Sequence, residues 1–222
     1  MPYLEQTWAI FLKDFRLEWR SRYGVSTVLA FIASSMLVVL LSLQVNQLSV
    51  QIQSGLIWIL VLFASLTTLA RVFISESERG TMDLLRLNSP AISVYLGKLL
   101  YNFLLTLLIT SVTFSLFIVL VNMHIERADL FAAIVIFGSS GISGATTLLG
   151  ALVSQAVRKG AVFPVVALPL LMPLMLVLVR ITQSIFTTIQ VETLLNDLAA
   201  LIGFTGITIS ASIVLFDNLW ED

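Results

Sequence analysis

The sequence predicts an all-α integral membrane protein in which an N-terminal amphipathic helix precedes six membrane-spanning helices. Hydrophobic residues make up 58% of the 222 positions, and charged residues make up only 11%. Because a soluble domain carries about 25% charged residues, this composition is typical of a chain surrounded by lipid. Six apolar runs, each long enough to cross a bilayer as a helix, support the same fold class. Cysteine is absent, which excludes disulfides and thiolate metal sites.

Residues 1–24 predict a cytoplasmic helix lying in the headgroup region of the membrane. On a helical projection its apolar side chains share one arc, and its basic side chains share another. This pattern is typical of an interfacial helix, and a soluble helix packed on a partner is the alternative. Since the stretch is charged throughout, we expect it not to be a cleaved signal. The expected membrane face comprises Trp8, Phe11, Leu12, Phe15 and Trp19.

Six spans are expected after this helix, and residues 217–222 form a short cytoplasmic tail. Trp58 lies near the outer end of the second span, where an indole favours the membrane interface. Acidic and basic side chains are absent from the third, fourth and fifth spans, which argues against a proton-driven transporter. The spans are expected at about 25–43, 56–74, 99–121, 130–153, 161–179 and 198–216.

The distribution of lysine and arginine predicts the orientation of the chain. Ten of the twelve basic residues fall on one side of the alternating spans. The positive-inside rule puts that side, and with it both termini, in the cytoplasm. The ten are Lys13, Arg16, Arg20, Arg22, Arg71, Arg79, Arg86, Lys98, Arg158 and Lys159, and the other two are Arg127 and Arg180.

The cytoplasmic segment 75–98, between the second and third spans, is polar and predicts a short helix of its own. Thr81 can cap that helix with its hydroxyl, and Asp83 in the first turn suits the helix dipole. Carboxylates at Glu76 and Glu78, near the negative end of the second span, are better explained by a partner or by nearby arginines. We expect the segment to be held by a partner, with an ordinary loop as the alternative. Its candidate docking residues are Glu76, Glu78, Gly80, Thr81, Asp83, Leu84, Leu85, Arg86 and Pro90.

Two spans have unusual compositions. Small residues in the fourth span allow another helix to approach its backbone closely, and prolines in the fifth span remove backbone donors and favour kinks. Packing is one interpretation of both patterns, and a moving or partner-facing surface is the other. The glycines are Gly138, Gly141, Gly144 and Gly150, and the prolines are Pro164, Pro169 and Pro173.

No catalytic residue is predicted. The Ser139 motif, Gly138-Ser139-Ser140-Gly141, resembles the Gly-x-Ser element of rhomboid-type intramembrane proteases, but a serine nucleophile needs a base and the sixth span has no histidine. The only histidine, His124, lies in an outer turn, where we expect it to be solvated. Gly97-Lys98 lacks the glycine-rich loop of an ATPase. We therefore assign no metal-ligating or haem-ligating residue.

Five sequence elements, in order along most of the chain, resemble the CcmB family, the membrane subunit of the haem-exporter-type ABC complex of cytochrome c maturation. The Glu-x-Glu-x-Gly-Thr element is shared with six-span ABC exporter permeases in general. The chain length, short outer loops and proline-rich fifth span favour CcmB within that group. The elements are Gly55-Leu-Ile-Trp58 with Phe63, Glu76-x-Glu78-x-Gly80, Pro90 followed by Tyr95-Leu96-Gly97-Lys98-Leu99-Leu100-Tyr101-Asn102, Arg158-Lys159-Gly160 with the three prolines, and Phe216-Asp217.

The resemblance implies an ABC-2-type exporter permease fold with 1–24 as the elbow helix and Gly80–Asn88 as the coupling helix, docked on a separate cytoplasmic ATPase. The implied partners are a CcmA-like ATPase, a CcmC-like haem-handling subunit, a CcmD-like small membrane protein and a CcmE-like periplasmic haem chaperone. The other expected partners are a second copy of the chain and the lipid bilayer, and no nucleic-acid partner is expected. The implied location is the bacterial inner membrane.

The same resemblance implies that ATP binds the partner ATPase and that haem is handled by partner subunits. No cofactor is expected on this chain itself, because the interiors of its spans offer no charged residue to pair with haem propionates, and unpaired buried charge is costly. A permease for a lipid or drug remains the alternative function, and an intramembrane protease is the less favoured one.

Overall fold

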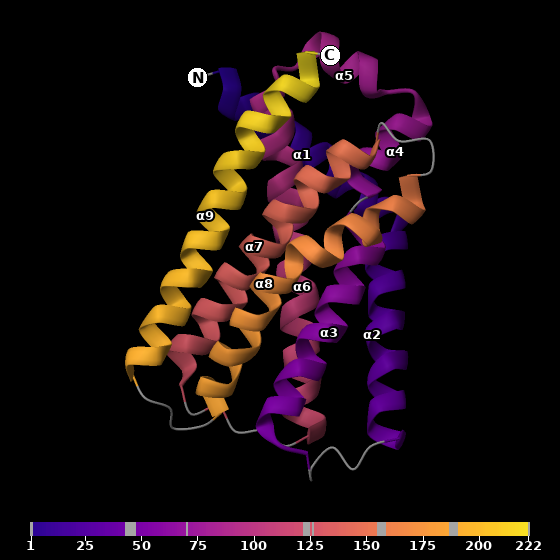
Figure 1. The fold of residues 1–222 in the computed structure, drawn as a ribbon. Helices are drawn as coiled ribbons and strands as arrows, with labels where there is room; N and C mark the ends of the chain where they lie inside the picture. The colour runs from indigo at the N-terminus through magenta and orange to yellow at the C-terminus, as the bar shows by residue number, and fades with distance from the viewer. Residues whose placement is uncertain are drawn as a thin grey trace.

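The computed structural model describes residues 2–42, 48–69, 71–121, 125, 127–154, 159–186 and 191–221. Every regular element within these residues is an α-helix, so the predicted all-α fold class is confirmed. Figure 1 shows long helices running side by side as a bundle, with α5 and both chain termini at the same end. The helices are α1 (Pro2–Ser21), α2 (Tyr23–Ser42), α3 (Val50–Thr68), α4 (Arg71–Arg79), α5 (Met82–Asn88), α6 (Ala91–Val121), α7 (Ala128–Ser154), α8 (Lys159–Phe186) and α9 (Val191–Glu221).

Six helices in the described part of the chain are long and apolar enough to cross a membrane. The amphipathic α1 precedes them, as the sequence predicts. The second of these candidate spans joins α3 to α4, which places α4 at the end of a span rather than in a loop. The six are Tyr23–Ser42, Val50–Arg79, Ala91–Val121, Ala128–Ser154, Val162–Phe186 and Leu194–Trp220.

Helix α7 lies at the centre of the bundle, and its glycines allow close approach of its neighbours. A Cβ at Gly138 would lie 2.9 Å from the Leu178 side chain of α8, and one at Gly144 would lie 2.9 Å from Ile209 of α9. Gly141 similarly faces Leu174 and Thr205 at 3.0 Å, and Gly150 is buried. These contacts support the packing interpretation, since larger side chains would push α8 and α9 away.

Helix α8 contains all three prolines without interruption of its helical assignment. Each proline removes one backbone hydrogen bond, which favours bending at these points. In Figure 1 the first half of α8 crosses the bundle obliquely, and the second half runs more nearly along it. The first proline, Pro164, is half-buried, whereas Pro169 and Pro173 are exposed.

Trp58 lies in the core, so the prediction that it anchors α3 at the membrane interface is wrong. Its side chain is only 1% exposed, and its ring packs edge-on against Phe114 with centroids 5.7 Å apart. The indole Nε1 donates a hydrogen bond to Thr182 Oγ1 at 2.8 Å. Because Thr182 satisfies the indole N–H inside the bundle, the side chain needs no contact with the headgroup region.

Candidate functional site

The candidate site lies at the end of the bundle that carries α5, which we call the α5 end. Helix α4 stops at Arg79, and Gly80 then adopts a left-handed conformation (φ +67°), which a glycine reaches without strain. This turn redirects the chain into α5. After α5 the chain is extended at Ser89, and the carbonyl of Pro90 accepts the first hydrogen bonds of α6, at 3.1 and 3.2 Å.

Helix α5 presents an apolar face to the surroundings. Leu84 and Leu87 are 60% and 82% exposed, and none of the seven residues of α5 is buried. Asp83 in the first turn and Asn88 in the last are also exposed. Residues three apart lie on one side of a helix, so Leu84 and Leu87 form a single exposed pair.

Leu85 differs from these two leucines, because it is half-buried against an internal apolar cluster that includes Phe73, Tyr95 and Phe216. The hypothesis that Leu84 and Leu85 together face a partner is therefore corrected. Adjacent residues on a helix point about 100° apart, so Leu85 turns inward while Leu84 turns outward. Leu87, not Leu85, is the neighbour of Leu84 on the exposed face.

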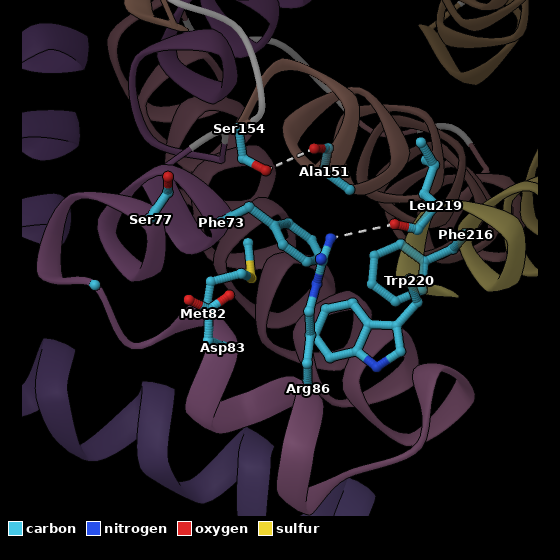
Figure 2. A pocket seen from close by; sticks show the side chains of 11 residues that line it. Phe73, Ser77, Met82, Asp83, Arg86, Ala151, Ser154, Phe216, Leu219 and Trp220 are labelled. Atoms are coloured by element: carbon cyan, nitrogen blue, oxygen red, sulfur yellow. Dashed lines mark hydrogen bonds between the residues drawn. The ribbon is translucent and has the colours of Figure 1, made fainter. Parts of the chain in front are cut away.

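The last turn of α9 supports α5 from one side, through contacts that we call the aromatic brace (Phe216, Trp220 and their partners Arg86 and Ser89). The Arg86 guanidinium donates a hydrogen bond to the Leu219 carbonyl at 3.4 Å, and it lies 5.7 Å from the centre of the Trp220 ring. The Trp220 indole donates to the Ser89 carbonyl at 3.3 Å. Arg86 thus points inward rather than toward a partner, as Figure 2 shows.

Phe216 is the centre of the brace. Its ring lies 5.2 Å from that of Trp220 and 5.5 Å from those of Phe73 and Tyr95, and its side chain is 2% exposed. A cavity of about 310 Å³ between the brace and the ends of α4 and α7 is visible in Figure 2. The cavity is lined by both polar and apolar side chains, among them Ser77, Asp83, Ser154 and Phe216.

A cluster of four charged side chains, which we call the charged node (Lys13, Asp14, Glu76 and Lys98), supports α5 from the other side. Lys98 of α6 is completely buried. Its Nζ donates three hydrogen bonds, to the Val72 carbonyl at 2.9 Å, Oδ2 of Asp14 at 3.2 Å and Oε1 of Glu76 at 3.4 Å. Two carboxyl groups face two lysines, so the formal charges of the node balance.

Lys13 of α1 completes the node at its more accessible edge. It forms a close ion pair with Glu76 and lies 3.4 Å from Asp14. Partial burial disfavours the charged amine, but Asp14 and the hydrogen bond to Glu76 outweigh that effect and raise the pKa of Lys13 above its usual value. Lys13 therefore stays protonated at neutral pH and links α1 to α4.

Thr81 connects this node to the start of α5. Its hydroxyl donates to the Glu76 carboxylate, and its backbone N–H donates to the Glu76 carbonyl at 3.0 Å. Thr81 occupies the N-cap position of α5 but makes no side-chain cap hydrogen bond. The prediction that its hydroxyl caps the helix is therefore wrong, because the neighbouring carboxylate is the stronger acceptor.

Glu76 is only 6% exposed, so the expectation that it reaches a partner, Arg71 or Arg79 is also wrong. Its carboxylate faces inward, toward Lys13, Lys98 and Thr81. Glu78, two residues later, is exposed. The two glutamates lie on different sides of α4 because successive helical positions differ by about 100°.

Helix α1 packs on α6 by a face other than its aromatic one. Thr7, Ile10 and Asp14 are the buried residues of α1, and a Cβ at Gly97 would lie 2.9 Å from both Ile10 and the Thr7 carbonyl. The backbones of the two helices therefore meet at Gly97, next to Lys98. Glycine is required here to bring Lys98 within reach of Asp14.

The aromatic residues of the expected membrane face of α1 form a row, within which Phe11 and Phe15 also pack against the core of the bundle. Neighbouring rings from Trp8 to Trp19 are 5.0, 6.0 and 6.0 Å apart. Trp8 and Trp19 are 56% and 69% exposed, whereas Phe11, Leu12 and Phe15 are half-buried. Such a row can lie in a headgroup region, as predicted from the helical projection.

The sequence interpretation missed Lys13, Asp14 and Lys98 as a group, and it missed the role of Trp220. One signal was available for α1: Thr7, Ile10 and Asp14 recur at helical spacing on an arc separate from the aromatic one. A lysine eight residues into a long apolar helix was a second signal, since such a residue needs a partner.

Side chains with catalytic potential do not come together in the described residues. Ser139 is buried and donates to Thr110 Oγ1 at 3.3 Å rather than to a base. Within the same residues no group of three or more His, Asp or Glu side chains could hold a metal ion. His124, which the sequence places in an outer turn, lies outside the described residues.

Two comparisons with known proteins bear on this chain. The model of a family described as CcmB protein matches residues 5–214. A Rhodobacter capsulatus protein named Heme exporter protein B is 28% identical over 206 residues, which cover 91% of this chain and 92% of the relative. The family match begins in α1 and extends through most of α9, so it includes both the charged node and α5.

Proposed function

Because the chain belongs to the CcmB family, we propose that it is the membrane subunit of a haem-exporter-type ABC complex for cytochrome c maturation. The name of its Rhodobacter capsulatus relative, Heme exporter protein B, supports haem as the cargo of this complex. Six apolar helices support a multi-pass membrane protein. The chain is not itself an enzyme, and its role is to convert ATP hydrolysis in a partner subunit into movement of the membrane helices.

The exposed pair Leu84 and Leu87 is the observation that carries this proposal. Helix α5 is a short amphipathic helix whose inner face is held by the bundle and whose outer face is apolar and uncovered. Such a helix fits a hydrophobic groove on a partner. We assign α5 as the coupling helix and a CcmA-like ATPase as its partner, with Asp83 and Glu78 at the rim of the contact.

The orientation proposed from the basic residues is consistent with this assignment. Arginine and lysine cluster at the α5 end, and the positive-inside rule puts that end in the cytoplasm of a bacterial inner membrane. The cytoplasm is also where an ATPase finds ATP. In this orientation α1 is the elbow helix, and its aromatic row faces the cytoplasmic headgroups.

Haem is handled by partner subunits in this proposal. The central portions of the spans carry no basic side chain to pair with propionates, and an unpaired buried charge is costly. The partners are therefore a CcmC-like haem-handling subunit, a CcmD-like membrane protein, a CcmE-like chaperone outside the membrane and a second copy of this chain. No cofactor is assigned to the chain itself.

The docking test is the double substitution Leu84→Glu/Leu87→Glu in the complete complex. Burying each leucine at an interface contributes about 1.5–3 kcal/mol before association costs, and two glutamates would add charge against an apolar groove. We expect normal membrane levels of the subunit, loss of the co-purifying ATPase and loss of cytochrome c maturation.

Asn218→Glu is the control, because it adds a charge to an exposed residue of α9 at the same end of the bundle and leaves α5 unchanged. It should retain the ATPase. Full retention of the ATPase by the double leucine variant would show that α5 is not the docking element.

A further inference from the structure

Lys98 is fully buried where α6 meets two other helices, α1 and α4. It belongs to α6, and it binds Asp14 of α1 together with Glu76 and the Val72 carbonyl of α4. Burying an amine and two carboxylates removes their hydration, a cost that their mutual attraction must offset. An apolar side chain would fill this space more simply, so the charges at this position point to a role beyond packing.

The node is bonded directly to the start of the proposed coupling helix. Only Gly80 and Thr81 separate α4 from α5, and Thr81 is hydrogen-bonded to Glu76 through both its hydroxyl and its backbone N–H. At its other end α5 passes through Ser89 and Pro90 into α6, eight residues before Lys98. A displacement of α5 therefore acts on the node from both ends.

Helix α1 has no covalent link to α5 within this region, so its connection depends on side chains. Asp14 binds Lys98, Lys13 binds Glu76, and the backbone of α1 touches α6 at Gly97. Without the node, α1 would keep its apolar contacts with α6 but lose its ionic contacts with α4. The node is thus what ties α1 to the segment that leads into α5.

We propose that Lys98 is a positioning residue that joins α1, α4 and α6 into one unit, so that movement imposed on α5 by the ATPase reaches the elbow helix and the spans together. This inference rests on the proposed function, because it assumes that α5 receives the movement. Lys98 contacts neither ATP nor haem in this scheme, and it acts through Asp14 and Glu76.

A single substitution cannot separate this role from simple stabilisation, because removing one member of a buried ionic cluster leaves an unpaired charge and destabilises the fold. The informative variant is Lys98→Met/Glu76→Gln, which removes one positive and one negative charge. Lys13 and Asp14 then remain as a pair, 3.4 Å apart. The matched control is Arg127→Gln/Asp129→Asn, which removes an exposed ion pair, 2.8 Å apart, at the start of α7. Helix α7 begins at the end of the bundle opposite α5 (Figure 1).

The variants are expressed with the complete complex, and four quantities are measured: the membrane level of the subunit, the co-purified ATPase, ATP hydrolysis, and the holocytochrome c formed. We expect Lys98→Met/Glu76→Gln to keep the first three near wild type. The amount of holocytochrome c formed at equal ATPase activity should fall about fivefold or more. Fivefold is the lower end of the effects that energetic coupling between two sites typically produces. The Arg127/Asp129 control should match wild type in all four.

If Lys98→Met/Glu76→Gln forms as much holocytochrome c per ATP hydrolysed as the wild type, the proposal is overturned, and the node is only a stabilising cluster. Release of the ATPase would also overturn it, because the node would then serve docking. If the first pair fails to accumulate, Lys13→Met/Asp14→Asn cuts the α1 side while retaining the Lys98–Glu76 contact. The same loss of coupling is expected, and a wild-type ratio would again overturn the inference.

The docking hypothesis fails in a different way. Leu84→Glu/Leu87→Glu tests whether α5 binds the ATPase, and its readout is the amount of ATPase retained. The node variant tests what happens after binding, at normal ATPase retention. A complex that loses docking with the first variant and loses only coupling with the second supports both proposals independently.

Discussion

The two sides of α5 are held by opposite kinds of chemistry. On the α4 side the charged node joins Lys98 to carboxylates on two other helices, with every charge matched inside the bundle. On the α9 side the aromatic brace surrounds Phe216 with three rings and adds two longer hydrogen bonds, from Arg86 and Trp220.

The comparison shows how each attachment responds to change. The hydrogen bonds within buried ion pairs weaken steeply when donor and acceptor are misaligned, and a buried charge left without its partner is costly, whereas aromatic pairs accept several ring orientations over centroid distances of about 4.5–7 Å. The node therefore keeps α1, α4 and α6 at one fixed spacing. The brace can follow small movements of α5 while keeping it attached to α9.

The largest effect is expected from Lys98→Met alone. This change leaves Asp14 and Glu76 facing each other with only Lys13 between them, and loss of one partner of a buried pair costs about 3–5 kcal/mol. Thermal unfolding of the purified subunit in detergent should show a clear decrease in melting temperature. The neutral pair Lys98→Met/Glu76→Gln should recover most of it. Equal stability of the single and paired variants would contradict a charge-matched node.

The fold class, the N-terminal amphipathic helix and the presence of a short helix between the second and third spans could all be predicted from the sequence. These features depend on mean apolarity and on helical period, which neighbouring residues determine together. The family resemblance is likewise confirmed by the match over residues 5–214. The orientation of the bundle and the docking role of α5 remain predictions.

The direction of individual side chains could not be predicted in the same way. The sequence predicts Trp58 at the membrane interface, Glu76 at a partner or a nearby arginine, and Thr81 as a helix cap. In the structure, Trp58 bonds to Thr182, Glu76 to Lys98, and Thr81 to the Glu76 carboxylate. These partners are up to 124 residues distant in the chain. Only the packed structure reveals them, because local period determines which residues share a face but not which face is covered.

A smaller effect is expected from Phe216→Leu on the aromatic side. Leucine retains much of the buried apolar area but removes three ring contacts, each worth about 0.5–1.5 kcal/mol beyond that area. We expect a moderate decrease in thermal stability, below that of Lys98→Met, and unchanged retention of the ATPase. A decrease as large as that of Lys98→Met would show that the brace is as sensitive to substitution as the node.

The smallest effect is expected from Trp220→Phe. Phenylalanine keeps a ring against Phe216 and beside Arg86, but it cannot donate to the Ser89 carbonyl, which the indole reaches at 3.3 Å. A hydrogen bond of this kind contributes about 0.5–1.5 kcal/mol, and its half-buried position favours the lower part of that range. Hydrogen exchange should therefore show slightly faster opening around Ser89 and the end of α5, with the node unaffected. The control is Asn218→Ala, an exposed residue on the same helical turn whose amide bonds only within α9. If Trp220→Phe accelerates exchange in α1 or α4 as well, the two attachments act as one unit rather than as separate supports of α5.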